Sequence, residues 1–369
     1  MIYLDNAATS LLKPPAVCRA VRQAMLQAAS PGRGAHRASM TASEIVYRCR
    51  EEAAKLFHVG DPSRVVLTSN ATHALNIAIR SLVGPESRVL ITGFEHNAVL
   101  RPLKAVGAEI RVCGRTLFDR EGVLRDFRAQ IGEADAVVCT HVSNVFGFIL
   151  PIEEIASLCR EHRVPLIVDA SQSAGVLDLD MQKLGAAFIA MPGHKSLFGP
   201  QGTGILLCGV KGEPLLYGGT GSDSANPAMP DELPERLEAG TMNVPGIAGL
   251  YEGLRFVGDR TPEGIHRYES ALLKTLADRL SRVGGLRLYT DAGLGQAGIL
   301  SFTADGTDSE AFCEALSERG VFVRGGLHCA PLAHESAGTR AFGTVRISLS
   351  PFTDPEQIER AAALIEGLA

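Results

Sequence analysis

The sequence has no tryptophan and no uninterrupted apolar run long enough to cross a bilayer. Its first residues, Met1 to Asn6, also lack the basic segment and the apolar segment that open a signal peptide. These absences argue against a membrane protein and against secretion. We therefore expect a cytoplasmic protein that does not bind a membrane.

An excess of positive charge is lacking as well. The 36 Lys and Arg residues are outnumbered by 41 Asp and Glu residues, so the formal net charge is -5. Without a broad basic field, nucleic acid is an unexpected partner.

The eight cysteines form no C-x-x-C pair, and no His/Cys cluster has zinc-like spacing. We expect reduced thiols and no metal. Cys329 stands apart because its neighbours are glycine, histidine and proline.

The chain alternates strand-like and helix-like segments. Its 369 residues exceed one simple core and predict a large and a small domain. We place the large domain at residues 16–256, and the small α+β domain at residues 1–15 and 257–369. Short apolar runs separated by helical patterns predict an α/β fold, a sheet covered on both faces. The runs at 186–191 and 204–208 have no long helix between them, so part of this sheet is expected to be antiparallel.

Two local patterns give further predictions. Thr41-x-x-Glu44 matches a capping box and predicts a helix that begins there and ends at Phe57. The stretch from Gly218 to Pro234 is rich in Gly, Ser, Asp and Pro and predicts a long loop. Loops of that length in compact domains are usually functional or disordered.

The sharpest chemical motif is a lysine between glycines, Gly193-His194-Lys195-Ser196-Leu197-Phe198-Gly199. A loop lysine alone is usually just solvated. However, Asp169 ends an apolar strand upstream of it, where open α/β sheets place ligand sites. Pyridoxal phosphate (PLP) needs a carboxylate on its pyridine nitrogen and a lysine amine for its carbonyl. Taken alone, Asp169 is explained equally well as a helix N-cap.

Other polar groups also follow predicted strands. Backbone N–H groups near Thr72, with the Thr72 hydroxyl, could hold a phosphate at a helix start. His96 could cover one face of a pyridine ring. Each of these is better explained, on its own, as a helix cap or a surface residue. Ser143 and Asn144 could reach the ring hydroxyl or a substrate carboxylate. Because all these groups share one predicted sheet edge, together they favour a single cofactor site.

The chain resembles the class V, fold type I PLP enzymes, and most closely the cysteine desulfurase and selenocysteine lyase family. The matching segments keep the order of the family across nearly the whole chain. They are Tyr3-Leu4-Asp5-Asn6-Ala7-Ala8, Arg33-Gly34-Ala35-His36-Arg37, Ala71-Thr72-His73-Ala74-Leu75-Asn76, Glu95-His96-Asn97-Ala98, Thr140-His141-Val142-Ser143-Asn144, Asp169-Ala170-Ser171-Gln172, Gly193-His194-Lys195, Glu238-Ala239-Gly240-Thr241 and Arg324-Gly325-Gly326-Leu327-His328-Cys329-Ala330.

The resemblance implies a role for each cofactor-binding position. Lys195 would form the Schiff base with PLP, and Asp169 would pair with the pyridinium. His96 would stack on the ring, and Gln172 would bond its hydroxyl. The phosphate would be held by four residues, one of them from the other subunit of a homodimer: Ala71, Thr72, His194 and, across the dimer, Thr241.

The resemblance also implies how a substrate is held and cleaved. Arg346 would clamp the substrate carboxylate bidentately, with Asn144 and Arg324 nearby. Cys329 stands where the group with the R-x-G-x-H-C motif places its sulfur-accepting cysteine. Its thiolate would be activated by its surroundings, to which His328 and Arg324 could contribute. The structural alternative is an inert cysteine near a glycine turn.

The implied function is a homodimeric cysteine desulfurase that converts L-cysteine to L-alanine and keeps the sulfur as a persulfide on Cys329, for a possible acceptor protein. Alternatives are a selenocysteine lyase acting on L-selenocysteine, another class V activity such as an aminotransferase or epimerase, and a PLP-binding or sulfur-carrier scaffold without turnover. Four departures from the common family pattern indicate a divergent subgroup, namely Pro192, Leu327, Ala71 and His73.

Overall fold

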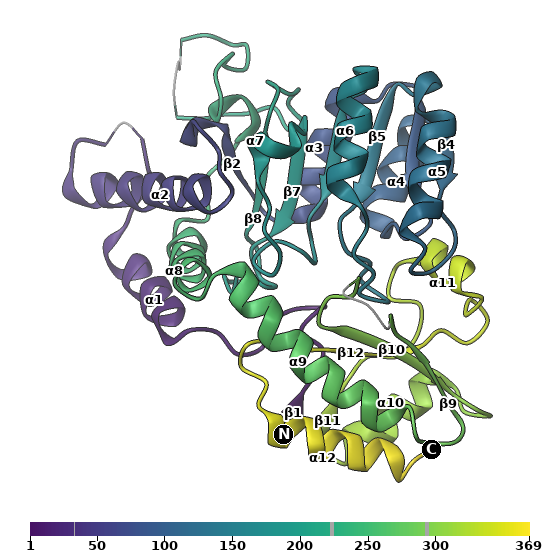
Figure 1. Cartoon of the computed structure of the whole chain (residues 1–369). Coiled ribbons are helices and arrows are strands. Elements are labelled where there is room, and N and C mark those ends of the chain that lie inside the picture. The colour runs from purple at the N-terminus through teal and green to yellow at the C-terminus, as the bar shows by residue number, and fades with distance from the viewer. Residues whose placement is uncertain (33, 222–224, 292–294) are drawn as a thin grey trace.

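A computed structural model describes residues 1–32, 34–221, 225–291 and 295–369. A seven-stranded sheet with its helices forms the upper part of the molecule, and a smaller part lies below it (Figure 1). Arg33 of the family motif and residues 222–224 of the predicted 218–234 loop fall outside the described residues. In the part of the chain that is described, no helix is long and apolar enough to cross a membrane.

The large sheet is mixed but mostly parallel. Strand β8 is antiparallel to β2 and β7, and the other neighbours are parallel. The predicted α/β class and its antiparallel portion are confirmed. In spatial order the strands are β2 (Val65–Thr68), β8 (Gly204–Cys208), β7 (Phe188–Pro192), β6 (Leu166–Asp169), β5 (Ala136–Thr140), β3 (Arg88–Thr92) and β4 (Glu109–Cys113).

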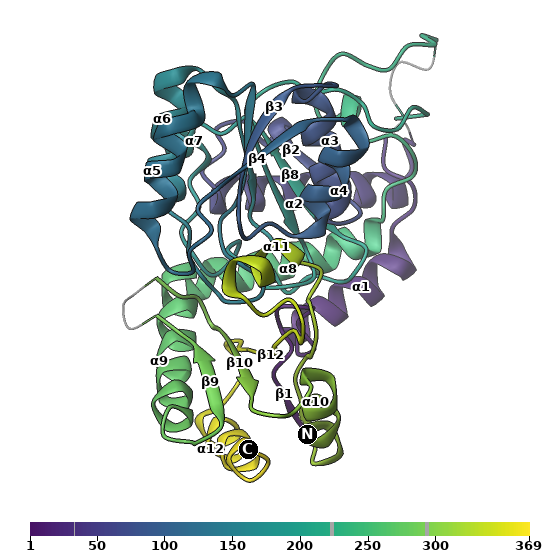
Figure 2. The same cartoon turned by 90° about the vertical axis from the view of Figure 1, so that its right-hand side faces the viewer.

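Helices cover both faces of this sheet, as its apolar strands require. Strands β5 to β8 are buried at every residue, so alternate side chains enter two separate apolar clusters. Figure 2 shows α3 and α4 on one side of the sheet and α5 and α6 on the other. One face packs on α3 (Ala71–Leu82) and α4 (Asn97–Val106). The other packs on α2 (Arg37–Leu56), α5 (Arg120–Gln130), α6 (Ile152–His162), α7 (Met181–Leu184) and α8 (Val244–Arg260).

The smaller part has its own apolar cluster, to which Ile2 and Leu4 contribute from the amino terminus. Strand β1 (Ile2–Tyr3) pairs in parallel with β11 (Val321–Phe322). A three-stranded sheet joins β12 (Val345–Ser348), β10 (Ile299–Ala304) and β9 (Leu286–Tyr289). The helices here are α9 (Pro262–Leu280), α10 (Ser309–Glu318) and α12 (Pro355–Glu366). This separate cluster supports the domain division at residues 16–256, which stays a proposal.

Helix α1 (Pro15–Gln27) packs against α8 within the large part, and another helix joins the two parts. Helix α11 (Pro331–Ala337) lies in the predicted small domain, yet Ala333 belongs to an apolar cluster of the large sheet. The loop before α11 carries Cys329, and the packing of α11 therefore attaches this loop to the large part.

The predicted capping box at Thr41 is wrong. Helix α2 already begins at Arg37, where the His36 ring accepts a hydrogen bond from the Ser39 N–H at 3.3 Å. Thr41 therefore lies inside the helix. A histidine nitrogen replaces the expected threonine hydroxyl as the acceptor at this helix start.

Candidate active site

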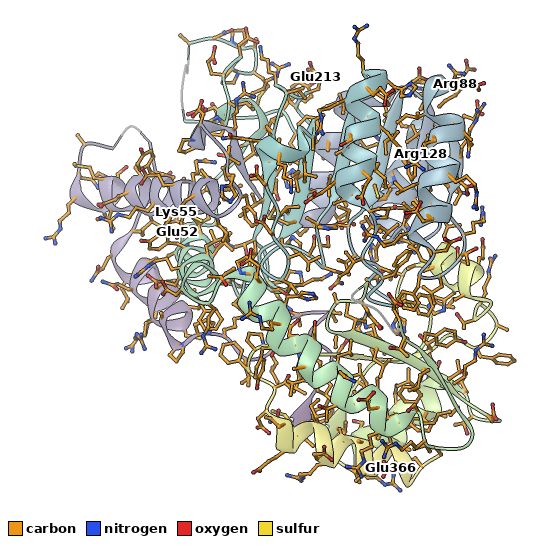
Figure 3. All side chains as sticks on the ribbon, viewed as in Figure 1. Glu52, Lys55, Arg88, Arg128, Glu213 and Glu366 are labelled. Atoms are coloured by element: carbon orange, nitrogen blue, oxygen red, sulfur yellow. The ribbon has the colours of Figure 1, made fainter. Side chains whose placement is uncertain are left out.

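One edge of the large sheet collects the predicted site residues. Strands β2, β3, β5, β6 and β7 run in the same direction, so their carboxyl ends meet at one edge. Arg88, the first residue of β3, is labelled at the opposite edge, away from the smaller part (Figure 3). The carboxyl ends therefore face the junction of the two parts. Five predicted residues stand directly at these ends or in the segments after them: Thr72, His96, Asn144, Asp169 and Lys195.

Lys195 and Asp169 come from neighbouring strands. Asp169 ends β6 and pairs with Ala190 of β7, while Lys195 follows β7 directly. The Asp169 side chain is not a helix N-cap, because it accepts from the Ser171 N–H at 2.9 Å in a turn with no helix after it. Burial lowers the pKa of Lys195 to about 8, against the opposing pull of the Asp169 charge. The site thus presents an amine that is easily made neutral beside a fixed carboxylate.

His96 both caps a helix and faces the site. Its Nδ1 accepts from the Ala98 N–H at 2.9 Å, so the cap that the sequence offered as an alternative is present. Burial lowers the pKa of His96, and the charges of Asp169 and Lys195 also act on it. A neutral ring close to these two residues is compatible with stacking on a flat cofactor. The two roles of His96 do not exclude each other.

The start of α3 borders a cavity. Asn70 caps this helix by accepting from the His73 N–H at 2.8 Å, which leaves the hydroxyl of Thr72 uncommitted to the cap. Thr72, His73 and Thr241 of the same chain line a cavity of about 490 Å³. The His73 Nε2 is buried there without a hydrogen-bond partner. Ala71 opens the helix, so its backbone N–H is among the donors free for an anion.

The predicted phosphate contact of His194 is not part of this cavity. Its ring Nδ1 lies 3.0 Å from the Thr9 hydroxyl. Burial lowers the pKa of His194 to about 4, with help from Lys195 and Lys13. His194 is therefore a neutral ring held by the amino-terminal segment.

The amino-terminal segment, for which the sequence predicted no role in the site, contacts it directly. The His194 carbonyl, one peptide bond before Lys195, accepts from the Ser10 N–H at 3.2 Å, the Ser10 hydroxyl at 3.0 Å and the Lys13 Nζ at 3.4 Å. The Gln172 side chain donates to the Ala7 carbonyl at 3.0 Å. These bonds fix the backbone that carries the lysine and orient the glutamine amide.

Arg346 of β12 is buried, and two of its three guanidinium nitrogens have hydrogen-bond partners. Its Nη1 donates to the Asn144 carbonyl at 2.9 Å, and its Nη2 donates to Asp5 at 2.8 Å. The Arg346 Nε has no partner, although the side chain is only 3% exposed. Arg324, with a side chain 52% exposed, donates from its Nε to the other Asp5 oxygen at 3.0 Å. A buried, unmatched guanidinium N–H suits an anionic ligand.

Cys329 is exposed on a loop that is fixed to the same edge. Its carbonyl accepts from the Asn97 N–H at 2.8 Å, and the His328 carbonyl accepts from the Asn144 side chain at 2.8 Å. His328 and Cys329 have φ of 49° and 55°, which costs backbone energy in residues other than glycine. The two hydrogen bonds hold the thiol-bearing loop in that conformation.

The ring of His328 does not serve Cys329 as a cation. It is buried, and its Nε2 lies 3.1 Å from the Thr344 carbonyl. Burial strongly lowers the pKa of His328, and the nearby Arg346 charge adds to that effect. A neutral ring brings no positive charge to the thiol, and a contribution of His328 to the activation of Cys329 stays a prediction.

The residues at this edge fit PLP. A buried carboxylate ends β6, a lysine with a lowered pKa follows the neighbouring strand β7, and a neutral histidine lies near both. At the same sheet edge, a helix start, a threonine hydroxyl and an unpartnered histidine nitrogen border a cavity. These are the groups needed for the ring nitrogen, the carbonyl carbon, the ring face and the phosphate.

Comparison with known proteins gives the class. The family model described as "Aminotransferase class-V" matches residues 2–361, so the chain belongs to the class V aminotransferase family, whose members are PLP-dependent enzymes. Several of its relatives within that family are named as probable cysteine desulfurases. A "Probable cysteine desulfurase" of Methanothermobacter thermautotrophicus is 30% identical over all of this chain and 94% of its own length. Another from Halalkalibacterium halodurans is 31% identical over all of this chain and 92% of its own length.

Solved structures agree. The apo structure of a cysteine desulfurase from Thermococcus onnurineus has a TM-score of 0.92 and 30% identity, covering all of this chain and 94% of that one. The Escherichia coli cysteine desulfurase CsdA has a TM-score of 0.87 at 24% identity, covering 99% of this chain and 94% of that one. This second likeness is one of fold.

Proposed function

We propose that this chain is a PLP-dependent cysteine desulfurase that carries PLP on Lys195 and takes up sulfur on Cys329. One observation carries the proposal. The loop with the exposed Cys329 is hydrogen-bonded to Asn97 and Asn144, which follow β3 and β5 at the same sheet edge as Lys195. The loop that carries this thiol is therefore held at the candidate cofactor site. The desulfurase relatives support the same conclusion.

Each side chain of the site would have a separate role in the reaction. PLP, when bound, supplies an electron sink for charge that develops on the substrate. Asp169 would pair with the ring nitrogen and His96 would cover the ring. Arg346 would hold the substrate carboxylate through its free Nε. Lys195 would take the proton from the substrate α-carbon and return a proton to the product.

The sulfur transfer needs only groups already named. The Cys329 thiolate attacks the substrate sulfur, the carbon–sulfur bond of the substrate breaks and a sulfur–sulfur bond forms on Cys329. L-Cysteine and one thiol thus become L-alanine and one persulfide, with no external oxidant. The exposure of Cys329 leaves the persulfide open to an acceptor thiol, and we propose an acceptor protein as the partner.

The lowered pKa of Lys195 predicts the pH dependence of PLP capture by the apoprotein. Only the neutral amine attacks the PLP carbonyl, and its fraction rises with pH until the pKa is passed. The rate of covalent capture should therefore rise with pH and level off above pH about 8. Stopped-flow absorbance at several pH values measures this rate. A rate that keeps rising toward the ordinary lysine value of 10.5 would contradict the assignment.

A panel of amino acids distinguishes the alternatives. The PLP-loaded protein is incubated with L-cysteine, L-selenocysteine, L-alanine and L-aspartate, and alanine, sulfide, selenide, keto acids and D-amino acids are measured. We expect alanine from L-cysteine, with sulfide only when a reductant is added. Alanine from L-selenocysteine alone would indicate a selenocysteine lyase. Keto acid or a D-amino acid would indicate an aminotransferase or epimerase, and no product from any amino acid would indicate a scaffold.

We propose a homodimer as the working form. Large apolar side chains are exposed on α1 and α2, among them Met25, Leu26 and Tyr47. Covering them with a second copy would remove a sizeable apolar area from water. A contribution of Thr241 to the partner's phosphate site remains part of this proposal, as does a cytoplasmic location.

A further inference from the structure

The carboxylate of Asp5 lies between the two arginines of the candidate substrate site. One oxygen accepts from the Arg346 Nη2 at 2.8 Å, and the other accepts from the Arg324 Nε at 3.0 Å. The Asp5 side chain is 12% exposed, so these contacts are largely shielded from water. Such charge-assisted bonds are stronger than neutral ones. Asp5 thus connects one buried and one exposed guanidinium.

The backbone around Asp5 is fixed on both sides. The Leu4 N–H donates to the Phe322 carbonyl at 2.8 Å, and the Ser348 N–H donates to the Leu4 carbonyl at 2.7 Å. The Ala7 N–H donates to the Ser348 hydroxyl at 2.8 Å. The segment therefore runs between β11 and β12, and this pairing holds the backbone of Asp5 beside the two arginines.

The three side chains together carry one net positive charge. Two guanidinium groups contribute two positive charges, and Asp5 removes one of them. The one buried nitrogen left without a hydrogen-bond partner among them is the Arg346 Nε. One net positive charge and a buried free N–H match a single carboxylate. A second carboxylate on the substrate would meet a position whose positive charge Asp5 already offsets.

The group acts on the reaction site itself. Burial is the largest influence on the pKa of Lys195, and the charges of Asp169, Arg346, Asp5 and Arg324 also act on that pKa. Two further titratable side chains lie near Asp5: burial and the Asp5 charge raise the pKa of both Tyr3 and Cys313, and the Tyr3 hydroxyl donates to the Asp5 carbonyl at 3.2 Å. The charges of this group therefore act both on Lys195 and on a substrate carboxylate held at Arg346.

We propose that Asp5 is a specificity-determining, positioning residue. It orients Arg346 for one α-carboxylate and, by neutralising a second cationic position, disfavours amino acids with an acidic side chain. This inference rests on the proposed role of Arg346 in holding the substrate carboxylate. It applies to any α-amino acid substrate of this site, whether or not the sulfur chemistry is as proposed.

The test compares two ligands on the PLP-loaded protein. Binding of L-alanine and L-aspartate is measured by titration calorimetry for the wild type, Asp5→Asn and the charge control Glu335→Gln. Glu335 lies on α11 and pairs with Arg340 and Arg115, outside the site. We expect the wild type and the control to prefer L-alanine. In Asp5→Asn the affinity for L-aspartate relative to L-alanine should rise about tenfold or more, the size of one charge-assisted contact.

A merely structural role for Asp5 would weaken both ligands alike, and an unchanged affinity ratio in Asp5→Asn overturns the proposal. If that variant does not fold, Arg324→Gln provides the opposite change, because it removes a cation from a largely exposed position. Its preference for L-alanine over L-aspartate should then increase, and a decrease or no change overturns the proposal. Since the readout is binding, it stands apart from alanine formation, whose absence would contradict only the desulfurase function.

Discussion

Replacing Lys195 with alanine is expected to lower alanine formation from L-cysteine by at least ~10³-fold, because one side chain both holds the cofactor and moves the proton at the substrate α-carbon. The variant should still fold, since no hydrogen bond from the Lys195 side chain is found among the described contacts. Its PLP should be removable by dialysis. Borohydride reduction followed by peptide mass spectrometry should label Lys195 in the wild type and no lysine in the variant.

Lys183 provides the matched control for this experiment. It is an exposed lysine on α7 that pairs with Glu153 by a hydrogen bond of 2.8 Å. Lys183→Ala should keep the reduced cofactor on Lys195 and keep the turnover of L-cysteine. A Lys195→Ala protein in which the reduced cofactor is attached to another lysine would disprove the assignment.

Replacing Cys329 with serine is expected to lower alanine formation from L-cysteine by at least ~10³-fold, because a hydroxyl is a far weaker nucleophile toward sulfur than a thiolate. The binding of L-cysteine should persist, because Asp169, Lys195 and Arg346 are unchanged. Steady-state alanine release checks the loss, and calorimetry checks the retained binding.

Cys18 is the natural control for Cys329. Among the cysteines, all of which lie within the described residues, only these two are exposed, and Cys18 lies on α1. Cys18→Ser should keep full activity. If Cys329→Ser also kept full L-cysteine turnover, the persulfide mechanism would be wrong and Cys329 would be a bystander.

Much of the fold could be predicted from the sequence because its strands are short, apolar and separated by amphipathic helices. Asp169 and Lys195 stood out because each follows such a strand, and parallel strands bring their carboxyl ends to one edge. The antiparallel β8 was indicated by the missing helix after β7. The mixed, mostly parallel α/β sheet followed from these local signals.

The remaining contacts depend on tertiary structure that local patterns do not contain. Asp5 and Arg346 are 341 residues apart in the sequence, and only the pairing of the amino-terminal segment with the small domain brings them together. The start of α2 was misplaced because His36 caps it in place of a hydroxyl residue. His328 is neutral because it is buried against Thr344. The sequence around it did not indicate this burial, since its neighbours Leu327 and Cys329 are both exposed.

The central claim is that sulfur from L-cysteine is transferred to Cys329. The most direct measurement is a single turnover of the PLP-loaded protein with one equivalent of L-cysteine, without reductant, followed by peptide mass spectrometry. The account predicts one alanine per protein and a mass gain of one sulfur atom on the Cys329 peptide, reversed by a thiol reductant. Alanine formed while the Cys329 peptide stays unmodified, or extra sulfur on another cysteine, would contradict it.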